Sequence, residues 1–186
     1  MLRKPILFAI LALVVTFLIA GAYLYFTRPT WQTYKNKELE ISLDWPDTFE
    51  RRELTKRHRD ANYVFSVECE KPKALFSLRH EAGLGPLKMT GGSVMDALVS
   101  AVNRRYPSRY PDYEKELFEE KIVANEKASL FEFTYTGADG ETKMRQRLII
   151  VVRNEEAYYL IFQAPEKSFS KSELVFDRIT ESLEFL

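Results

Sequence analysis

Residues 118–164 read FEEKIVANEKASLFEFTYTGADGETKMRQRLIIVVRNEEAYYLIFQA, and this stretch decides the fold. It contains four segments rich in β-branched and aromatic residues, which favour strands: Phe118–Val123, Ala128–Thr136, Lys143–Arg153 and Ala157–Ala164. Short runs of asparagine, glycine and charged residues separate these segments, as turns do. The stretch therefore predicts an antiparallel meander of four strands.

Alternating segments that precede the meander predict further strands. Glu38–Asp44 alternates polar and apolar residues, which is the pattern of a half-buried strand, and Phe49–Leu54 is a candidate second strand. Asn62–Glu70 alternates again. It is joined to Leu75–His80 by Lys71-Pro72-Lys73, which predicts a hairpin.

Two helices are predicted, one before and one after the meander. Ser93, with Asp96 three residues later, is close to a capping box, and an apolar stripe at helical spacing follows it. Pro107 and Pro111 are expected to end this helix. Ser170 is the expected cap of the closing helix. The order of elements predicts an α+β protein, with an antiparallel sheet of about six to eight strands and helices packed against it.

Residues that share one strand face, or the buried stripe of the closing helix, are the expected core. Their spacing follows the period of two for strands and the longer period of a helix. The predicted core residues are Phe65, Val67, Phe131, Phe133, Leu160, Phe162, Val175 and Ile179.

The N-terminal segment has the composition of a membrane anchor. Residues 5–26 contain no charged side chain and follow the basic pair Arg3 and Lys4. A helix of this length reaches roughly 33 Å, enough to cross a bilayer core of about 30 Å. We therefore predict an N-terminal transmembrane helix within a signal anchor at residues 1–30, followed by one α+β domain at residues 31–186. Thr27–Lys37 is interpreted as a linker.

A cleavable signal peptide is the competing interpretation of this segment. Ala20-Gly21-Ala22 satisfies the cleavage pattern, but apolar residues continue beyond it to Phe26. A retained anchor is favoured because the apolar part of a cleaved signal is shorter, about 7–15 residues. Arg3 and Lys4 favour a cytoplasmic N-terminus, which puts the domain on the extracytoplasmic side, in the periplasm or on the outer face.

Charge and composition exclude several classes of function. The first 30 residues hold three cations and no acid, so residues 31–186 carry a net charge of −3, which does not suit a nucleic-acid binder. The single cysteine, Cys69, excludes a disulfide within the chain. With only two histidines, the chain has no ligand set for structural zinc. We expect no metal, no cofactor and no nucleic-acid partner.

Three stretches resemble the PsbP-like fold family, which includes an extrinsic photosystem II protein and a nuclear factor that binds the GTPase Ran. They are the opening strand and turn at residues 39–49, the late strand at 158–164 and the closing helix at 179–185. The order of elements matches over residues 31–186, and the chain looks like a membrane-anchored prokaryotic member. The resemblance implies a non-enzymatic domain that docks on a larger assembly.

Residues 51–59 form the densest charge cluster of the domain. Arg51, Arg52, Arg57 and Arg59 are candidate partner-binding residues, since arginine offers a planar fork for carboxylate or phosphate. A protein partner and anionic lipid headgroups both fit this chemistry. The alternative interpretation is an ordinary solvated hairpin.

Residues 104–111 interleave cations with aromatic side chains. Arg104, Arg105, Tyr106 and Tyr110 are candidate partner-binding residues, because arginine and tyrosine are enriched where binding energy concentrates in interfaces. The alternative is a helix end whose arginines complement the helix dipole.

Other polar residues are weaker candidates for chemistry. His80 shares strand parity with core positions and is expected to be a structural histidine, and Cys69 a small core residue. His58 lies in the basic cluster and has no carboxylate nearby in the sequence except Asp60. The acidic residues of segment 114–120 suit a hard cation such as calcium, but no loop with ligand spacing accompanies them.

Two hypotheses of different classes follow. The favoured one is a non-enzymatic, membrane-anchored module that binds or assembles, as an accessory subunit of a larger membrane complex. The alternative is a hydrolase-like enzyme whose site is assembled from scattered residues. A nucleophile and a base within hydrogen-bond reach in a deep cleft would favour the enzyme, and an exposed aromatic–arginine surface would favour binding.

Overall fold

The computed structural model describes residue 14, residues 29–90 and residues 92–186. Contacts divide the chain into two units, Met1–Thr30 and Trp31–Leu186. The predicted anchor at residues 5–26 falls outside the described residues, apart from Val14. Among the described residues, no helix has the length and apolar character needed to cross a membrane.

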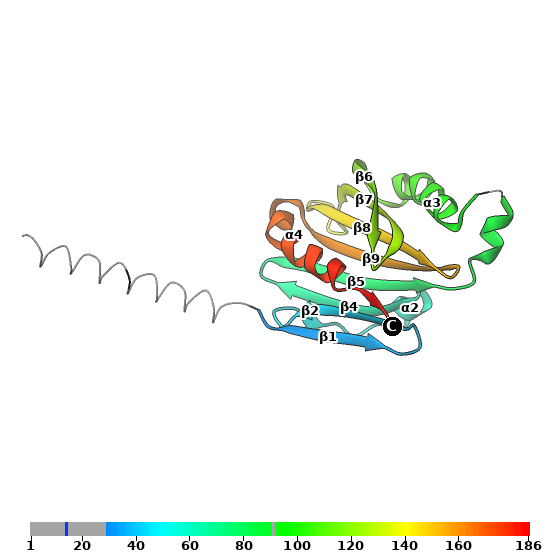
Figure 1. Ribbon diagram of the computed structural model, residues 1–186. Helices are drawn as coiled ribbons and strands as arrows, with labels where there is room; N and C mark the ends of the chain where they lie inside the picture. The colour runs from blue at the N-terminus through cyan, green and yellow to red at the C-terminus, as the bar shows by residue number, and fades with distance from the viewer. Residues whose placement is uncertain (1–13, 15–28, 91) are drawn as a thin grey trace, which may run out of the picture. The chain divides into compact units, whose positions relative to one another are not determined.

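The unit Trp31–Leu186 is built from strands and helices in the order shown in Figure 1. The elements are β1 (Trp31–Asn36), β2 (Ile41–Pro46), β3 (Glu50–Arg51), α2 (Lys56–Asp60), β4 (Tyr63–Glu70), β5 (Lys73–Glu81), the 3-10 helix η1 (Gly85–Thr90), α3 (Val94–Arg109), β6 (Glu114–Val123), β7 (Glu126–Thr136), β8 (Lys143–Arg153), β9 (Glu156–Pro165), α4 (Glu166–Glu181) and β10 (Glu184–Phe185).

The strands form two antiparallel sheets where the sequence predicted one. The larger has seven strands in the order β3-β4-β5-β9-β8-β7-β6, and the smaller has three in the order β1-β2-β10. The predicted meander β6 to β9 and the β4–β5 hairpin are confirmed. The interpretation of Thr27–Lys37 as a linker was wrong, because Trp31–Asn36 pairs with β2 along its whole length.

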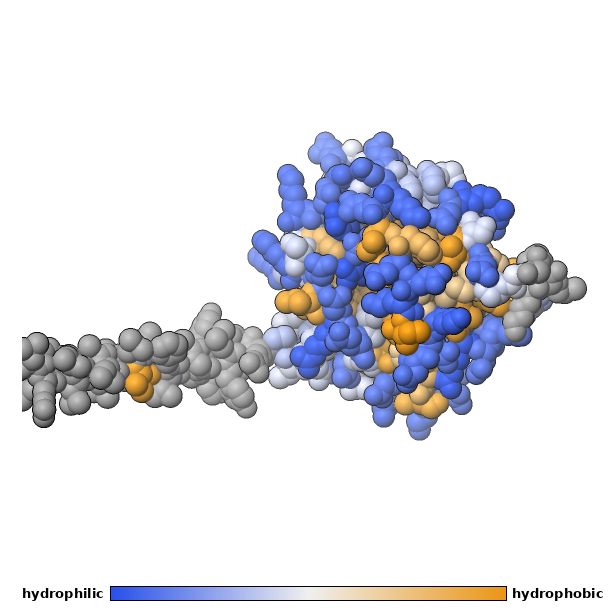
Figure 2. Space-filling view, turned by 45° about the horizontal axis from the view of Figure 1, so that its top comes forward, coloured by the Kyte–Doolittle hydropathy of each residue, from blue (hydrophilic) through white to orange (hydrophobic). Residues whose placement is uncertain are grey.

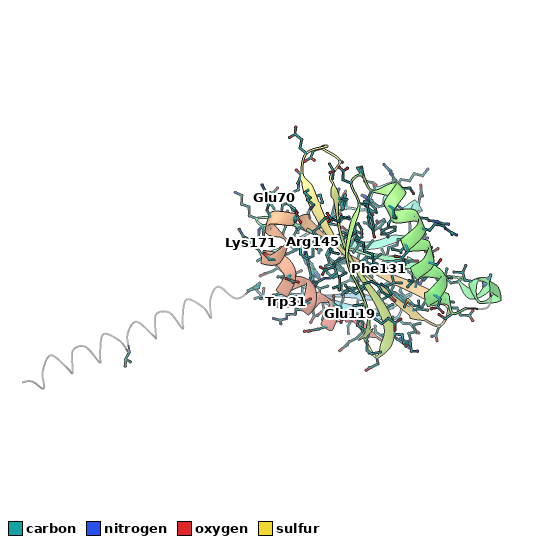
Figure 3. The ribbon with its side chains drawn as sticks, turned by 90° about the horizontal axis from the view of Figure 1, so that it is seen from above. Trp31, Glu70, Glu119, Phe131, Arg145 and Lys171 are labelled. Atoms are coloured by element: carbon teal, nitrogen blue, oxygen red, sulfur yellow. The ribbon has the colours of Figure 1, made fainter. Side chains whose placement is uncertain are left out.

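Other elements pack on both faces of the seven-stranded sheet, because the side chains that point to either face of its central strands are mostly apolar. On one face, Val94, Leu98 and Val102 of α3 pack against the sheet. On the other face, α4 and strand β2 cover a second set of core residues. Figure 3 shows α3 and α4 flanking the strands on opposite sides, with Phe131 toward α3 and Arg145 toward α4. The sheet is therefore the middle of three layers.

The predicted core is largely confirmed. The six strand residues and Ile179 are at most 2% exposed, whereas Val175 is only partly buried. These residues do not share one cluster, however. Phe65, Leu160 and Phe162 face α4, and Phe131 faces α3. Alternation within one strand shows which residues share a face, but it does not show which layer covers that face.

Three element boundaries differ from the sequence prediction. Helix α3 continues through Pro107 to Arg109, and beyond the proline Tyr110 N still donates to Tyr106 O at 3.0 Å. Helix α4 begins at Glu166, four residues before the predicted cap Ser170. The predicted strand Phe49–Leu54 shortens to Glu50–Arg51, and the short helix α2 follows it.

A network of ion pairs ties α4 to the sheet. Arg147 of β8, with 9% of its side chain exposed, contacts Glu132 of β7 at 2.5 Å. The same guanidinium reaches Glu173 and Asp177 of α4, each at 2.7 Å. Arg145, two residues earlier on the same face of β8, contacts Glu116 at 2.6 Å. The buried pair sits at the centre of the network and fixes how α4 lies across the strands.

Strand β6 is the free edge of the large sheet and is exposed along most of its length. Leu117, Phe118 and Ile122 are exposed apolar residues on it, with 42%, 38% and 65% of their surface accessible. Charged residues occupy most of the remaining positions. Figure 2 shows hydrophobic patches set among hydrophilic residues when the top of the domain is brought forward. Such charges are the usual protection of an edge strand.

Candidate protein-binding groove

Part of the α3 face of the large sheet is open, and its floor follows from the strand register. Ser66 of β4 lies opposite Ser77 of β5, which lies opposite Ile161 of β9. In the next row, Leu75 lies opposite Gln163. The two serine hydroxyls are 2.9 Å apart, so these buried polar groups bond to each other. The result is a floor in which the polar side chains Ser66, Ser77 and Gln163 lie beside Leu75 and Ile161, and we call it the polar groove.

Two segments distant in sequence flank the polar groove. On one side is the loop that ends in α2, whose Leu54 and His58 line the groove beside Tyr63 and Ser66. On the other side is the C-terminal end of α3. Asp60 at the end of α2 lines the same cavity as Tyr106 and Tyr110 of α3. The fold thus brings the two predicted partner-binding segments, 51–59 and 104–111, to one surface.

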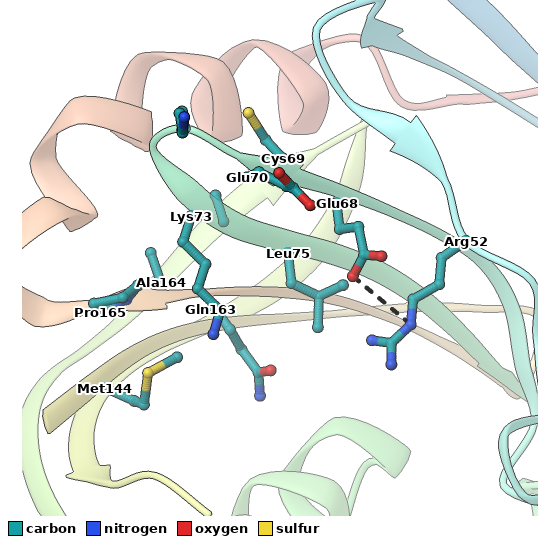
Figure 4. Close-up of a pocket in the computed structure, with 12 residues that line it drawn as sticks. Arg52, Glu68, Cys69, Glu70, Lys73, Leu75, Met144, Gln163, Ala164 and Pro165 are labelled. Atoms are coloured by element: carbon teal, nitrogen blue, oxygen red, sulfur yellow. Dashed lines mark ion pairs between the residues drawn. The ribbon is translucent and has the colours of Figure 1, made fainter. Parts of the chain in front are cut away.

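Three cavities follow one another along the groove and share Gln163 in their lining. The largest, about 650 Å³, lies at the turn between β4 and β5, and the other two are about 240 Å³ and 260 Å³. Figure 4 shows Arg52, Leu75 and Gln163 directed toward the largest cavity, with the ion pair between Arg52 and Glu68 drawn. That pair spans 3.8 Å between half-exposed side chains, so it leaves the arginine largely available.

The cavity of about 260 Å³ is lined by three tyrosines, Tyr63, Tyr106 and Tyr110, and we call it the tyrosine pocket. Tyr106 and Tyr110 pack against Phe133, with ring centroids 5.5 Å and 5.1 Å from it. Burial raises the pKa of Tyr106, and the neighbouring Tyr110 raises it further. Burial likewise raises the pKa of Tyr110. Both phenols therefore stay protonated at physiological pH and act as hydrogen-bond donors.

Two arginines complete the tyrosine pocket. Arg79 of β5 stacks on Tyr159 at 4.5 Å and donates to Glu81 at 2.7 Å, so its guanidinium is held in place. Arg109 lies over the Tyr110 ring at 5.9 Å and is exposed. Sequence reasoning missed Arg79, Tyr63 and Gln163. Parity is a signal only for Arg79 and Gln163, which alternate with the core residues Leu78 and Phe162. Tyr63 has the parity of Phe65, and the register shift between the two places them in different clusters.

The four arginines of the basic cluster are exposed, but they are not equivalent. Arg51 and Arg52 leave β3 on opposite sides of the strand, and Arg51 lies 5.7 Å from the Phe65 ring. Arg51, Arg52 and Arg59 line a further hollow of about 640 Å³ beside β4. Arg59 also donates to the Leu54 carbonyl and so shapes the loop. Arg57 forms no ion pair with any described residue.

Of the four candidates named in the second predicted segment, only the two tyrosines line the groove; Arg109 of the same segment lines it as well. Arg104 and Arg105 are exposed and line none of the cavities described above. Tyr106 and Tyr110 are partly buried in the wall of the tyrosine pocket. The helix thus separates the segment into two sets: Tyr106, Arg109 and Tyr110 line the pocket, whereas Arg104 and Arg105 are exposed away from it.

The remaining candidates have structural partners. His80 contacts Glu156 at 2.9 Å, and this bond lowers the pKa of the Glu156 carboxyl. The Thr55 hydroxyl accepts a hydrogen bond from His58 N, and the His58 ring accepts one from Thr55 N, so this pair forms the capping box of α2. Cys69 is partly buried against the core. Within the described ranges, no three His, Cys, Asp or Glu residues are grouped to hold a metal ion.

Solved structures with the same fold come from distant organisms. Cyanobacterial PsbP (CyanoP) from Synechocystis has a TM-score of 0.59 at 11% identity, covering 86% of this chain and 94% of that one. LpqN of Mycobacterium tuberculosis, described as involved in cell envelope biogenesis, has a TM-score of 0.55 at 11% identity, covering 88% and 95%. The Saccharomyces cerevisiae Ran-binding protein Mog1p has a TM-score of 0.52 at 8% identity, covering 85% and 96%.

At these identities the likeness shows the fold alone, and it confirms the expected PsbP-like fold. No curated protein matches the chain in sequence. A family described as "Serine/threonine kinase C-terminal domain" matches residues 37–185, which is nearly all of the unit built on the two sheets. By fold this chain is PsbP-like, and by sequence it belongs to the serine/threonine kinase C-terminal domain family.

Proposed function

We propose that this chain is a non-enzymatic, membrane-anchored module that binds a protein partner outside the cytoplasm, as an accessory subunit of a larger membrane complex. The observation that carries the proposal is the convergence of segments 51–59 and 104–111 on the polar groove. A groove with exposed arginines on its rim and tyrosines in its wall has the composition typical of interface hot spots.

The comparisons support a binding role without identifying the partner. Mog1p is described as Ran-binding, so this fold does present a protein-binding surface in another protein. The family description places such modules in the C-terminal part of serine/threonine kinases, a position that suits a recognition unit joined to a catalytic one. An anchor would confine the module to a membrane surface, where even a weak interface gains from high local concentration.

The tripeptide His58-Arg59-Asp60 resembles part of a kinase catalytic loop, but the residues around it do not form a catalytic site. His58-Arg59-Asp60 has the letters of the kinase catalytic loop, in which an asparagine that binds metal follows the aspartate after five residues. Here the residue at that position is Phe65, which is 2% exposed and lies in the core. His58 caps α2 and Arg59 holds the Leu54 carbonyl, so the tripeptide serves the local fold.

The proposed anchor is tested by alkaline carbonate extraction of membranes that contain the full-length chain. We expect the protein to stay in the membrane pellet, because residues 5–26 form an uncharged apolar segment long enough to span the bilayer. A variant lacking residues 1–30 should appear in the soluble fraction. Release of the full-length protein by carbonate would show that no anchor is retained.

The proposed interface is tested by purifying the full-length chain from solubilised membranes and identifying the associated proteins by mass spectrometry. A variant in which Arg51, Arg52, Arg57 and Arg59 all become serine should lose the partner, because these four exposed cations lie together beside the groove and Arg52 lines it. The matched control also removes four exposed cations, and it should keep the partner. Its positions, which line neither the polar groove nor the tyrosine pocket, are Lys37, Lys127, Lys167 and Lys171.

Two results would contradict this interface. If the arginine variant keeps the same partners while its thermal unfolding matches that of the wild type, the basic rim is only a solvated surface. If the wild type binds anionic but not neutral liposomes and brings down no protein, the arginines recognise lipid headgroups and not a protein.

A further inference from the structure

We propose that the tyrosine pocket binds a carboxylate group, carried by an extended acidic segment of the partner protein. The inference rests on the proposed function, since it says which chemical group of the partner enters the groove. It concerns Tyr63, Tyr106, Arg79 and Arg109, and none of these residues belongs to the basic rim described above.

The pocket presents hydrogen-bond donors that have no partner within the domain. The hydroxyls of Tyr63 and Tyr106 make no hydrogen bond to any residue the structure describes. The charges of Arg79 and Arg109 and the phenol of Tyr63 all act on the Tyr106 hydroxyl, which shows that these groups converge. Neither hydroxyl is among the fully buried atoms that lack a partner, so each can donate to a ligand in the pocket that accepts hydrogen bonds.

The cations set the charge of that ligand. Arg79 stacks on Tyr159 and its charge is paired with Glu81, but its Nε is buried without a hydrogen-bond partner among the described residues. Arg109 is exposed and supplies the positive charge that no described acid pairs with. Asp60 is the single acidic residue among those lining the pocket, and it is exposed at the end of α2. Donors therefore outnumber acceptors, and two of the donors are arginines. An anion with two planar acceptor oxygens matches arginine nitrogens and phenol hydrogens together.

The shape of the surroundings favours a peptide over a free small anion. Ile161 and Gln163 line both the tyrosine pocket and the adjoining cavity, so the two spaces are continuous along the sheet. Gln163 also lines the largest cavity, and Arg52 lines that cavity as well. A groove of this kind accepts an extended chain, at about 3.3 Å per residue, with one acidic side chain in the pocket and further acids toward the basic rim.

The test measures fluorescence anisotropy of a rhodamine-labelled hexaglutamate peptide with the full-length chain in a non-ionic detergent. Hexaglutamine with the same label is the uncharged counterpart. We expect the acidic peptide to bind at least about tenfold more tightly, since a charge-assisted hydrogen bond contributes about 1.5–3 kcal/mol. Arg109→Gln and Tyr106→Phe should each weaken binding by about tenfold on the same grounds.

Matched variants distinguish binding in the tyrosine pocket from attraction of the peptide by the net charge of the domain. Lys171→Gln removes one exposed charge from α4, and Tyr113→Phe removes a hydroxyl from a ring that packs on Phe133 without lining the pocket. Both should bind the acidic peptide as the wild type does. Tyr106→Phe keeps the ring that contacts Phe133, so the variant is expected to stay folded, and thermal unfolding checks this.

Three results would overturn the assignment of the pocket. Equal weakening by Arg109→Gln and Lys171→Gln would show attraction by net charge alone. Displacement of the peptide by millimolar inorganic phosphate would show a general anion site. Equal binding of hexaglutamate and hexaglutamine would show that no carboxylate is recognised. If the arginine-to-serine variant still loses its partner in any of these cases, the proposed interface stands and only the carboxylate pocket fails.

Discussion

Replacing Phe133 with alanine should destabilise the domain by about 3–5 kcal/mol, the largest effect we expect from one core substitution. Phe133 is fully buried, and four tyrosine rings surround it. Truncation removes the buried ring and leaves a cavity bordered by rigid aromatic side chains, which collapse poorly into the space. Denaturant unfolding followed by circular dichroism measures the loss as a shift of the midpoint.

Leu174→Ala is the control for this substitution, since Leu174 is 82% exposed on α4. Its effect should stay within about 0.5 kcal/mol. The Phe133 variant should also weaken peptide binding, because Tyr106 and Tyr110 lose the ring that positions them. A change below about 1 kcal/mol for Phe133→Ala would show that this face of β7 is not packed as described.

Replacing Arg147 with methionine should cost about 3 kcal/mol, for a different reason. The substitution leaves Glu132, which is 7% exposed, without the partner that neutralises it at 2.5 Å. Uncompensated buried charges typically cost about 3–5 kcal/mol. Arg145, 3.8 Å from Glu132, offsets part of that cost, which places the expected loss at the lower end. Equilibrium unfolding at neutral pH gives the value.

A double variant separates charge from packing at this site. In Arg147→Met combined with Glu132→Leu, both members of the buried pair are replaced by apolar groups. We expect most of the lost stability to return, since Glu173 and Asp177 are half-exposed and remain hydrated. If the double variant is less stable than Arg147→Met alone, the buried pair contributes through its geometry and not through compensation of charge.

The strands of the large sheet could be predicted because their signal is local. Alternation and turn residues within 118–164 suffice to define four strands, and the hairpin at residues 71–73 is equally short in range. The small sheet could not be predicted in this way. Trp31–Asn36 has no apolar run, and it forms a strand because β2 supplies a partner along its length. Such pairing depends on tertiary contacts more than on intrinsic propensity.

The sequence indicated two segments of the candidate site but not that they meet, for a related reason. The segments 51–59 and 104–111 stand out by composition, but nothing local indicates that α2 and the end of α3 flank the same groove. Arg79 and Gln163 are polar residues within strands that carry much of the core, and their role depends on which part of the sheet α3 leaves open. Parity assigns them to the face opposite the core, and only the packing of α3 distinguishes the covered rows from the open ones.

Strand β10 pairs with β2, although most of the domain sequence lies between them. Phe185 lies opposite Ile41, and Asp44 N donates to the Ser182 hydroxyl at 2.8 Å. During synthesis, β2 leaves the ribosome long before β10 exists. At about 5–20 residues per second, the delay is roughly 7–30 s. Throughout that time β2 has only β1 as a neighbour, and its apolar side chains Ile41 and Leu43 lack the α4 layer they pack against. The nascent chain therefore has an exposed strand edge until β10 is made, and a chain interrupted before α4 cannot close its small sheet.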